Sequence, residues 1–284
     1  MITVVRAGPL TTIQDQGRPA YAHLGVPRSG ALDARALRRA NTLVGNPVGA
    51  AGLETTLMGC ALRFEVAARV AVTGASAVVK VDKRPVAPGS PASPASPASP
   101  VVIDLPAGSV LDIGRATRGV RSYVAVSGGI DVLPVLGSRS TDTLSGLGPA
   151  KLVDGMRLAV GDETGDSPSD PGLSDLLELG VWLGPRDDWF SGNELFENPY
   201  QVSPMSNRVG CRLRGPGLRR AVPGELPSEG VVLGAIQVPA DGQPLIFLAD
   251  HPTTGGYPVI GVVDDVAPLA QARPGSTVRF RALH

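Results

Sequence analysis

The chain has 284 residues and a formal net charge of zero, because 26 Lys and Arg balance 26 Asp and Glu. That balance and an aromatic content of 4% argue against binding to nucleic acid or to an anionic membrane, because both favour basic surfaces. No apolar leader opens the sequence and no run approaches ~18 apolar residues, so we expect a cytoplasmic protein.

The elements expected from the sequence are mostly short β-strands. Glycine (36 residues) and proline (27 residues) are dispersed along the chain, which favours many tight turns over long helices. The expected fold class is therefore all-β, mainly β with few helices. Runs rich in β-branched residues and bounded by Gly, Pro or Asp predict strands at 2–7, 53–57, 61–66, 69–74, 77–82, 101–105, 122–128, 231–238, 244–249 and 277–283.

One segment, 33–45, has the periodicity of a helix. Its apolar residues, among them Leu37 and Val44, recur at the spacing of one helical face. Asp33 can cap the start and Gly45 can end the helix. We predict the main helix of the first half of the chain here.

The polar stretch at 161–175 predicts a domain boundary, because it precedes a renewed strand pattern. It would separate a first lobe, 1–165, from a second lobe, 176–284. A weak internal repeat agrees with this division, since "VRAGP" at 5–9 is matched by "VWLGP" at 181–185. The repeat suggests two related β-barrels.

Several kinds of active site are absent from the sequence. It contains no GxxxxGK[ST] phosphate loop, no GxSxG elbow and no HExxH pair. No lysine sits between methionines, so the chain is not expected to carry biotin. Cys60 and Cys211 lie far apart without a CxxC partner, which predicts two buried thiols. We therefore expect no metal.

The stretch "QPLIFLADHPTTGGYPVIG", residues 243–261, places an acid, a histidine and two threonines between two apolar runs. Two interpretations are open. The stretch can be a hairpin whose turn residues serve the backbone. Alternatively it lines a cleft near Arg208 or Asn207, and Asp250→Asn would then lower activity with little change in melting temperature.

Other loops are also dense in hydrogen-bonding groups. Arg139 and Arg208 lie in such loops and could each bind a carboxylate or a phosphate with two parallel hydrogen bonds. The Ser, Asn and Thr residues beside them could orient neutral amides. The alternative for each arginine is a solvated surface side chain.

Four longer segments occur in a characteristic order: from "GVPRSGALD" to "LMGCALRF" (25–64), from "GVRSYVAVSGG" to "GSRSTDTLSGLG" (119–148), "YQVSPMSNRVGCRLRGPGL" (200–218), and from "SEGVVLGAIQV" to "ADHPTTGGYPVIGVV" (228–263). In this order the segments resemble the allophanate hydrolase subunit 2 family. That family is also called the biotin-dependent carboxyltransferase or 5-oxoprolinase C-subunit family, and it includes the antagonist of a sporulation kinase inhibitor. The resemblance implies two cyclophilin-like β-barrel lobes. The Ser-Pro-Ala repeat at 89–100 departs from the family and predicts an exposed loop without chemistry.

The resemblance implies a subunit of an ATP-dependent 5-oxoprolinase, which opens 5-oxoproline to L-glutamate. The subunit would work only with a homologous subunit 1, which is kinase-inhibitor-like and also called the B-subunit, and with a ring-opening subunit. We expect ATP to bind at a site shared with a partner. Within this interpretation we expect proton handling by Asp142, Glu229 and Asp250. Substrate binding is expected from Arg139, Ser206, Asn207, Arg208, Thr253, Thr254 and Tyr257.

Two alternatives remain. The first is the carboxyltransferase component of a urea carboxylase, which would move a carboxyl group from biotin on another protein to a urea-like amide. The second is a regulator without turnover that antagonises a kinase inhibitor. Fold-level analogy does not separate functions that share one scaffold.

Overall fold

The computed structural model describes residues 1–86, 100–165, 177–224 and 226–283. The Ser-Pro-Ala loop expected at 89–100 lies, apart from its last residue, outside these ranges. The chain divides into two compact units. The first unit contains Met1–Arg18, Asp33–Asp142 and the described residues from Gly146 to the gap at 166–176. The second unit contains Pro19–Leu32, Thr143–Ser145 and the described residues after that gap.

The division into lobes 1–165 and 176–284 assigns each part of the chain by sequence order alone. The second unit also takes 19–32 and 143–145 from the first half of the chain.

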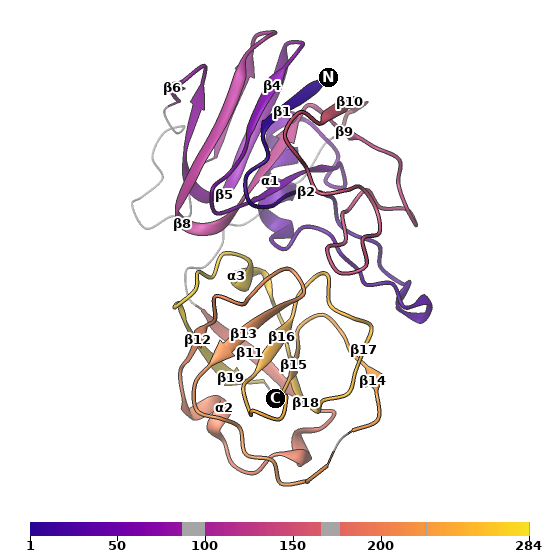
Figure 1. The fold of residues 1–284 in the computed structure, drawn as a ribbon, viewed down its shortest axis with the longest axis vertical. Helices are drawn as coiled ribbons and strands as arrows, with labels where there is room; N and C mark the ends of the chain where they lie inside the picture. The colour runs from indigo at the N-terminus through magenta and orange to yellow at the C-terminus, as the bar shows by residue number, and fades with distance from the viewer. Residues whose placement is uncertain (87–99, 166–176, 225, 284) are drawn as a thin grey trace. The chain divides into compact units, whose positions relative to one another are not determined.

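The first unit is built on one ten-stranded sheet (Figure 1). Its main path has the order β2-β3-β8-β4-β1-β10-β9, and the strand pairs are antiparallel. Three further strands, β5 to β7, extend it through β8. The strands are β1 Ile2–Arg6, β2 Thr11–Gln14, β3 Gly52–Thr56, β4 Ala61–Phe64, β5 Ala68–Val81, β6 Arg84–Pro85, β7 Val101–Leu105, β8 Val110–Val126, β9 Gly128–Asp131 and β10 Arg157–Glu163.

The helix predicted at 33–45 is confirmed as α1, Ala34–Val44. The Asp33 side chain accepts a hydrogen bond from the backbone N–H of Ala36 at 2.9 Å, and Gly45 ends the helix in the left-handed conformation with φ 78°. Both features satisfy backbone groups that a helix end leaves without partners. The apolar face packs on β5 and β8.

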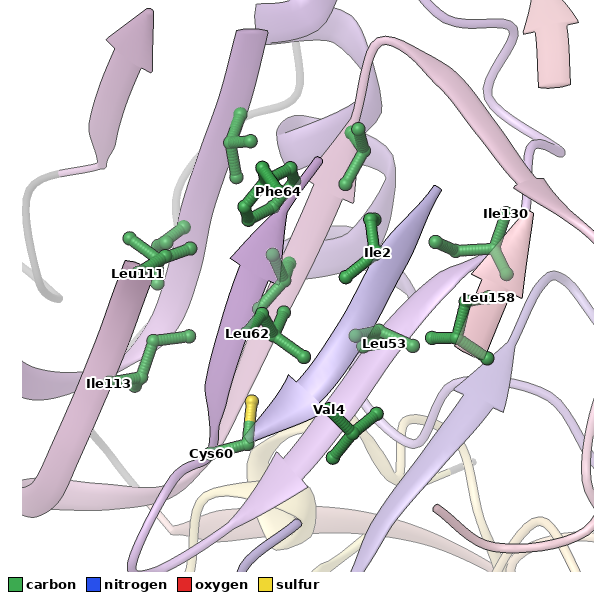
Figure 2. Packing of buried hydrophobic residues seen from close by; sticks show 14 of the residues in the cluster. Ile2, Val4, Leu53, Cys60, Leu62, Phe64, Leu111, Ile113, Ile130 and Leu158 are labelled. Carbon is green, nitrogen blue, oxygen red and sulfur yellow. The ribbon is translucent and has the colours of Figure 1, made fainter. Parts of the chain in front are cut away.

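The core of the first unit lies on one face of the sheet, where Ile2, Leu53, Leu62 and Phe64 are fully buried (Figure 2). Burial of each such side chain contributes about 1.5–3 kcal/mol. Cys60 lies in the same cluster, and burial raises the pKa of its thiol to about 12. The prediction of buried thiols is confirmed for both cysteines.

Two strands predicted at 69–74 and 77–82 are one strand, β5, and the prediction of a break between them was wrong. The register with β8 shifts after Gly74, which has φ 86°. A Cβ at Gly74 would lie 2.4 Å from the carbonyl oxygen of Arg121 on β8. The glycine therefore marks an irregularity within a long strand, where the backbones approach closely, and not a strand end.

The second unit is a closed barrel of seven strands in the order β11-β18-β15-β16-β13-β12-β19. A parallel pair, β11 with β19, closes it. A separate ladder pairs β14 with β17. The strands are β11 Glu178–Leu183, β12 Tyr200–Val202, β13 Gly210–Arg214, β14 Glu229–Gly230, β15 Ala235–Gln237, β16 Leu245–Phe247, β17 Thr254–Gly255, β18 Val259–Val263 and β19 Thr277–Ala282.

The inside of this barrel is apolar. Tyr200 and Phe280 meet edge to face with ring centroids 5.8 Å apart, a geometry that aromatic pairs favour. They are buried together with Val181 and Ile236. The short helical elements are η1 Ala22–Leu24, η2 Asp187–Trp189, α2 Glu194–Glu197 and α3 Ala267–Ala270.

The expected fold class, mainly β with few helices, is confirmed. Within the described ranges, no helix has the length and apolar character needed to cross a membrane.

Candidate functional site

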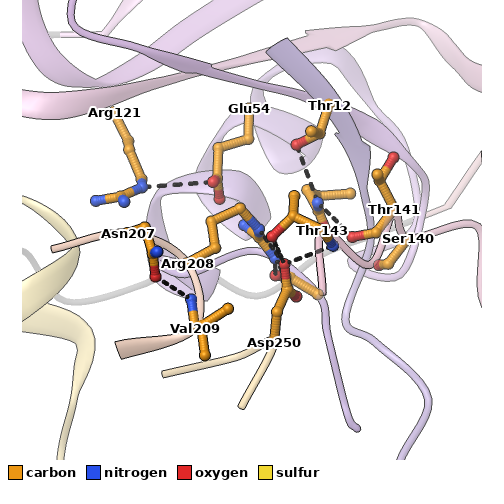
Figure 3. Close-up of polar contacts among 12 residues, drawn as sticks. Thr12, Glu54, Arg121, Ser140, Thr141, Thr143, Asn207, Arg208, Val209 and Asp250 are labelled. Atoms are coloured by element: carbon orange, nitrogen blue, oxygen red, sulfur yellow. Dashed lines mark hydrogen bonds and ion pairs between the residues drawn. The ribbon is translucent and has the colours of Figure 1, made fainter. Parts of the chain in front are cut away.

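A buried ion pair between Arg208 and Asp250 lies in the second unit (Figure 3). Arg208 precedes β13 and Asp250 follows β16. The guanidinium binds the carboxylate in two-pronged fashion, with Nε 2.8 Å from Oδ2 and Nη2 3.0 Å from Oδ1. Their side chains are 1% and 0% exposed. Such a parallel pair of charge-assisted bonds fixes both side chains in direction as well as distance.

The two short segments that join the second unit are bonded to this pair. Thr143 donates its backbone N–H and its hydroxyl to Asp250 Oδ2, at 3.0 and 2.6 Å. Arg208 Nη2 also donates to the carbonyl oxygen of Gly30 at 2.7 Å. We call Gly30, Thr143, Arg208 and Asp250 the Asp250 network. It connects segments that are far apart in the sequence.

The Asp250 carboxyl is ionised at neutral pH. Burial acts to raise its pKa, but the charge of Arg208 and the hydrogen bonds from Arg208 and Thr143 outweigh burial and lower the pKa from its ordinary value of 3.8. A group that transfers protons works best with a pKa near the operating pH. The geometry therefore favours a positioning role for Asp250 over the proton handling expected from the sequence.

The hairpin interpretation of residues 243–261 was wrong. β16 and β18, which would form the hairpin, lie on opposite sides of β15 in the barrel. The residues between them include β17, Thr254–Gly255, which pairs with β14. The stretch therefore connects two strands that are not paired with each other, and its turn builds a ladder with another segment.

Glu229 lies on the other strand of that ladder, opposite Gly255. It forms a two-pronged ion pair with Arg186, through Nη2 to Oε1 and through Nε to Oε2 at 3.2 Å. The hydrogen bond from Arg186 lowers the pKa of the Glu229 carboxyl. The side chains are 35% and 34% exposed, so this pair is accessible while the Asp250 pair is not.

The turn presents polar side chains from a backbone that is held in place. Thr254 and Tyr257 are exposed. The carbonyl oxygen of Tyr257 accepts a hydrogen bond from Gln237 Nε2 at 3.1 Å, and that of Thr253 accepts one from the Val231 N–H at 3.0 Å. A Cβ at Gly255 would lie 2.4 Å from Gln237 Nε2, so a larger residue there would displace the Gln237 amide.

His251 is buried beside the Asp250 network. Its ring is tilted against Phe247 with centroids 5.8 Å apart. Its Nδ1 lies 2.6 Å from the carbonyl oxygen of Pro252. Because a carbonyl only accepts, Nδ1 carries the proton.

Ser206 and Asn207 shape the turn that leads into β13. Asn207 Oδ1 accepts hydrogen bonds from the N–H groups of Val209 and Gly210 at 2.8 and 3.2 Å. Ser206 Oγ accepts one from the Arg212 N–H at 3.0 Å. The bonds of Asn207 follow a common pattern, in which an Asn side chain bonds to backbone two or three residues ahead, and the bond of Ser206 spans the turn to Arg212. The two residues therefore position Arg208, which follows them directly.

Arg139 and Asp142 belong to the first unit. Arg139 Nε donates to the carbonyl oxygen of Val132 at 2.9 Å. Asp142 is 1% exposed, and its backbone bonds to Leu147 and Gly146. The eight other expected site residues belong to the second unit.

Another buried carboxylate, Asp15, was not predicted from the sequence. It accepts hydrogen bonds from Ser138 Oγ at 2.6 Å, Ser140 Oγ at 2.5 Å, the Arg139 N–H at 2.6 Å and the Gly17 N–H at 2.7 Å. We call these five residues the Asp15 network. Arg186 and Thr143 were missed as well, since nothing local in the sequence marks the partners of a distant carboxylate.

In the ranges that the structure covers, no three His, Cys, Asp or Glu side chains gather where they could hold a metal ion.

The chain has extensive similarity to known proteins. Residues 24–282 match the family described as carboxyltransferase domain, subdomain A and B. The chain is 39% identical over 291 residues to the 5-oxoprolinase C-subunit of Escherichia coli strain K12, covering 99% of this chain and 90% of that protein. It is 33% identical over 299 residues to the 5-oxoprolinase C-subunit of Haemophilus influenzae, covering 100% of this chain and 91% of that protein. The crystal structure of K. lactis urea amidolyase matches with a TM-score of 0.87 and 29% identity, covering 100% of this chain and 19% of that chain.

Proposed function

The chain belongs to the carboxyltransferase domain family, subdomains A and B, and from this premise we propose that it is a subunit of an ATP-dependent 5-oxoprolinase. The observation that carries the proposal is the end-to-end similarity to the 5-oxoprolinase C-subunits of two bacteria. The reaction opens the lactam of 5-oxoproline to L-glutamate.

The chemistry of the lactam explains the requirement for ATP. An amide carbon is a poor electrophile. Transfer of a phosphoryl group from ATP to the lactam oxygen makes the lactam carbon reactive toward a nucleophile. Water then adds to that carbon, the ring C–N bond breaks, and a second water releases phosphate. The protein must hold the lactam and the phosphoryl donor in line, which calls for positioned donors more than for a covalent intermediate.

In this proposal the turn at Thr253–Tyr257 contacts the substrate, and the Asp250 network holds its start in place. Thr254 and Tyr257 supply exposed hydroxyl groups. The Arg186–Glu229 pair supplies an accessible cation and anion next to Thr254. Arg139 and Asp142 stay candidate site residues of the first unit, and ATP binds at a site shared with a partner.

Thr254→Val tests the turn directly. We expect turnover of the assembled enzyme to fall about tenfold, because a hydroxyl that positions the substrate is lost. The melting temperature should stay unchanged, since Thr254 is exposed. The matched control is Thr277→Val, another exposed strand threonine of the second unit, which should keep full turnover. Full activity in both variants would assign the turn a structural role.

The subunit should be inactive by itself. Its sequence has no phosphate loop and no nucleophile–base motif, so its polar groups complete a site only with other surfaces. We expect no release of ADP or glutamate from 5-oxoproline and ATP by the purified chain. Both products should appear when subunit 1 and the ring-opening subunit are added. Steady turnover by the isolated chain would contradict the shared site.

The similarity to urea amidolyase favours one alternative, the transfer of a carboxyl group from carboxybiotin on another protein to a urea-like amide. Turnover assays of the purified chain with its partners distinguish this alternative from the 5-oxoprolinase. Turnover that needs a carboxylated biotin carrier and an amide, and that does not occur with 5-oxoproline, would support the carboxyltransferase.

A further inference from the structure

Ser29 combines two unfavourable features in one buried residue. It is 3% exposed, and its hydroxyl has no hydrogen-bond partner among the residues that the structure describes. Its backbone has φ 53°, a left-handed conformation that costs free energy for a residue with a Cβ. An alanine at this position would avoid the buried hydroxyl, and a glycine would avoid both the hydroxyl and the cost of the left-handed conformation.

The backbone around Ser29 is held by the second unit. The Ser29 N–H donates to the carbonyl oxygen of Ala249 at 2.9 Å. The next carbonyl, that of Gly30, accepts from Arg208 Nη2 at 2.7 Å. Ala249 directly precedes Asp250, so the Asp250 network fixes the segment that carries the unpartnered hydroxyl. Buried polar groups without partners and strained residues concentrate at functional sites.

We propose that the Ser29 hydroxyl binds the amide group of the substrate, an inference that rests on the proposed function. Arg208, which binds the carbonyl oxygen of Gly30, is itself paired with Asp250 and therefore offers no unpaired charge to a ligand at this segment. Because burying an ionised carboxylate costs far more free energy than burying an amide, this buried hydroxyl suits the lactam better than the substrate carboxylate. The hydroxyl can donate to the lactam oxygen or accept from its N–H.

Access to Ser29 requires local opening, because the hydroxyl is enclosed. The preceding part of the same segment, η1, contains no buried residue, so the segment that carries Ser29 is only partly held by apolar contacts. Segments with few buried contacts open at low free-energy cost. The substrate would then be enclosed when the segment closes again, which separates the reacting groups from bulk solvent.

Ser29→Ala separates binding from structure. A hydroxyl without a partner contributes nothing to folding, so we expect the melting temperature of the assembled enzyme to stay the same or to rise. We expect kcat/KM for 5-oxoproline to fall about tenfold, as for one lost hydrogen bond. The rise in melting temperature that 5-oxoproline causes in the wild-type complex should become smaller in the variant.

Two further variants isolate the hydroxyl from the backbone conformation. Ser29→Gly should raise the melting temperature, because glycine tolerates positive φ, and it should lose activity as Ser29→Ala does. Ala20→Gly is the matched control, since Ala20 is exposed, has φ 74° and carries no hydroxyl. It should keep full activity.

A lower melting temperature in Ser29→Ala would reveal a structural partner and overturn the inference, as would an unchanged kcat/KM. If the wild-type complex does not turn over 5-oxoproline, the proposed function fails, and the Ser29 inference is judged by the stabilisation that urea causes. A wild-type complex stabilised by neither amide would overturn the inference too.

Discussion

Arg208→Met is expected to destabilise the second unit by about 3–5 kcal/mol, because it leaves the Asp250 carboxylate buried without its cation. The two side chains are 1% and 0% exposed, so water cannot replace the lost partner. Thr143 would still donate two hydrogen bonds to Asp250, but these do not neutralise a charge. The same argument revises the sequence-based expectation for Asp250→Asn, which should also lower the melting temperature.

Tryptophan fluorescence measures this effect in the second unit alone, because both tryptophans, Trp182 and Trp189, belong to it. Urea unfolding of Arg208→Met should shift to a lower midpoint. The double variant Arg208→Met with Asp250→Leu should recover part of the loss, since no unpaired charge remains. The control is Arg219→Met, which removes a surface ion pair whose arginine is 74% exposed and should change little. Equal midpoints for Arg208→Met and Arg219→Met would contradict a stabilising buried pair.

The loss should also depend on pH. In the wild type the pKa of Asp250 is lowered from 3.8, so its contribution to stability is complete above that value and disappears as pH falls below it. Without Arg208, burial dominates and the pKa of Asp250 should rise above its unfolded value, so the variant gains stability as pH falls. The difference between the two proteins should therefore shrink between pH 7 and about pH 4. A constant difference would show that the charge of Asp250 is not the cause.

Asp15→Ala is expected to destabilise the first unit by about 3 kcal/mol or more, because hydrogen bonds to a charged group contribute ~1.5–3 kcal/mol each. The change would remove the acceptor of two serine hydroxyls and two backbone N–H groups. Ser138 and Ser140 are both 0% exposed, so water does not replace that acceptor. The segment that carries Arg139 should lose its fixed position.

The second unit provides an internal reference for this variant. In urea unfolding followed by circular dichroism, the transition of the first unit should occur at a lower urea concentration in Asp15→Ala than in the wild type. The transition of the second unit, followed by tryptophan fluorescence, should keep the same midpoint. The matched control is Asp104→Ala. Asp104 lies on β7 of the first unit, and its side chain is 76% exposed. It should leave both transitions unchanged. A tryptophan transition that moves together with the first would refute a loss confined to the first unit.

Local chemistry was sufficient to predict several elements. The helix at 33–45 was predicted with its cap and its end, because Asp33 and Gly45 act within one turn of the chain. Most strands were predicted from β-branched runs. β5 was not predicted as one strand, since Gly74 breaks the pattern in the sequence but is a bulge in the sheet.

For the candidate site, residue type and spacing were sufficient to suggest some of the candidate residues, and the fold shows how each of them is paired and buried. Arg208, Asp250 and Glu229 were identified from polar loops and from a family resemblance. That Arg208 binds Asp250, that Arg186 binds Glu229, and that the buried Ser29 hydroxyl has no partner among the described residues all depend on which distant segments come into contact. Burial and pairing set the charge state and the strain of these side chains. Both depend on contacts between segments that are distant in the sequence, so they cannot be read from the linear sequence.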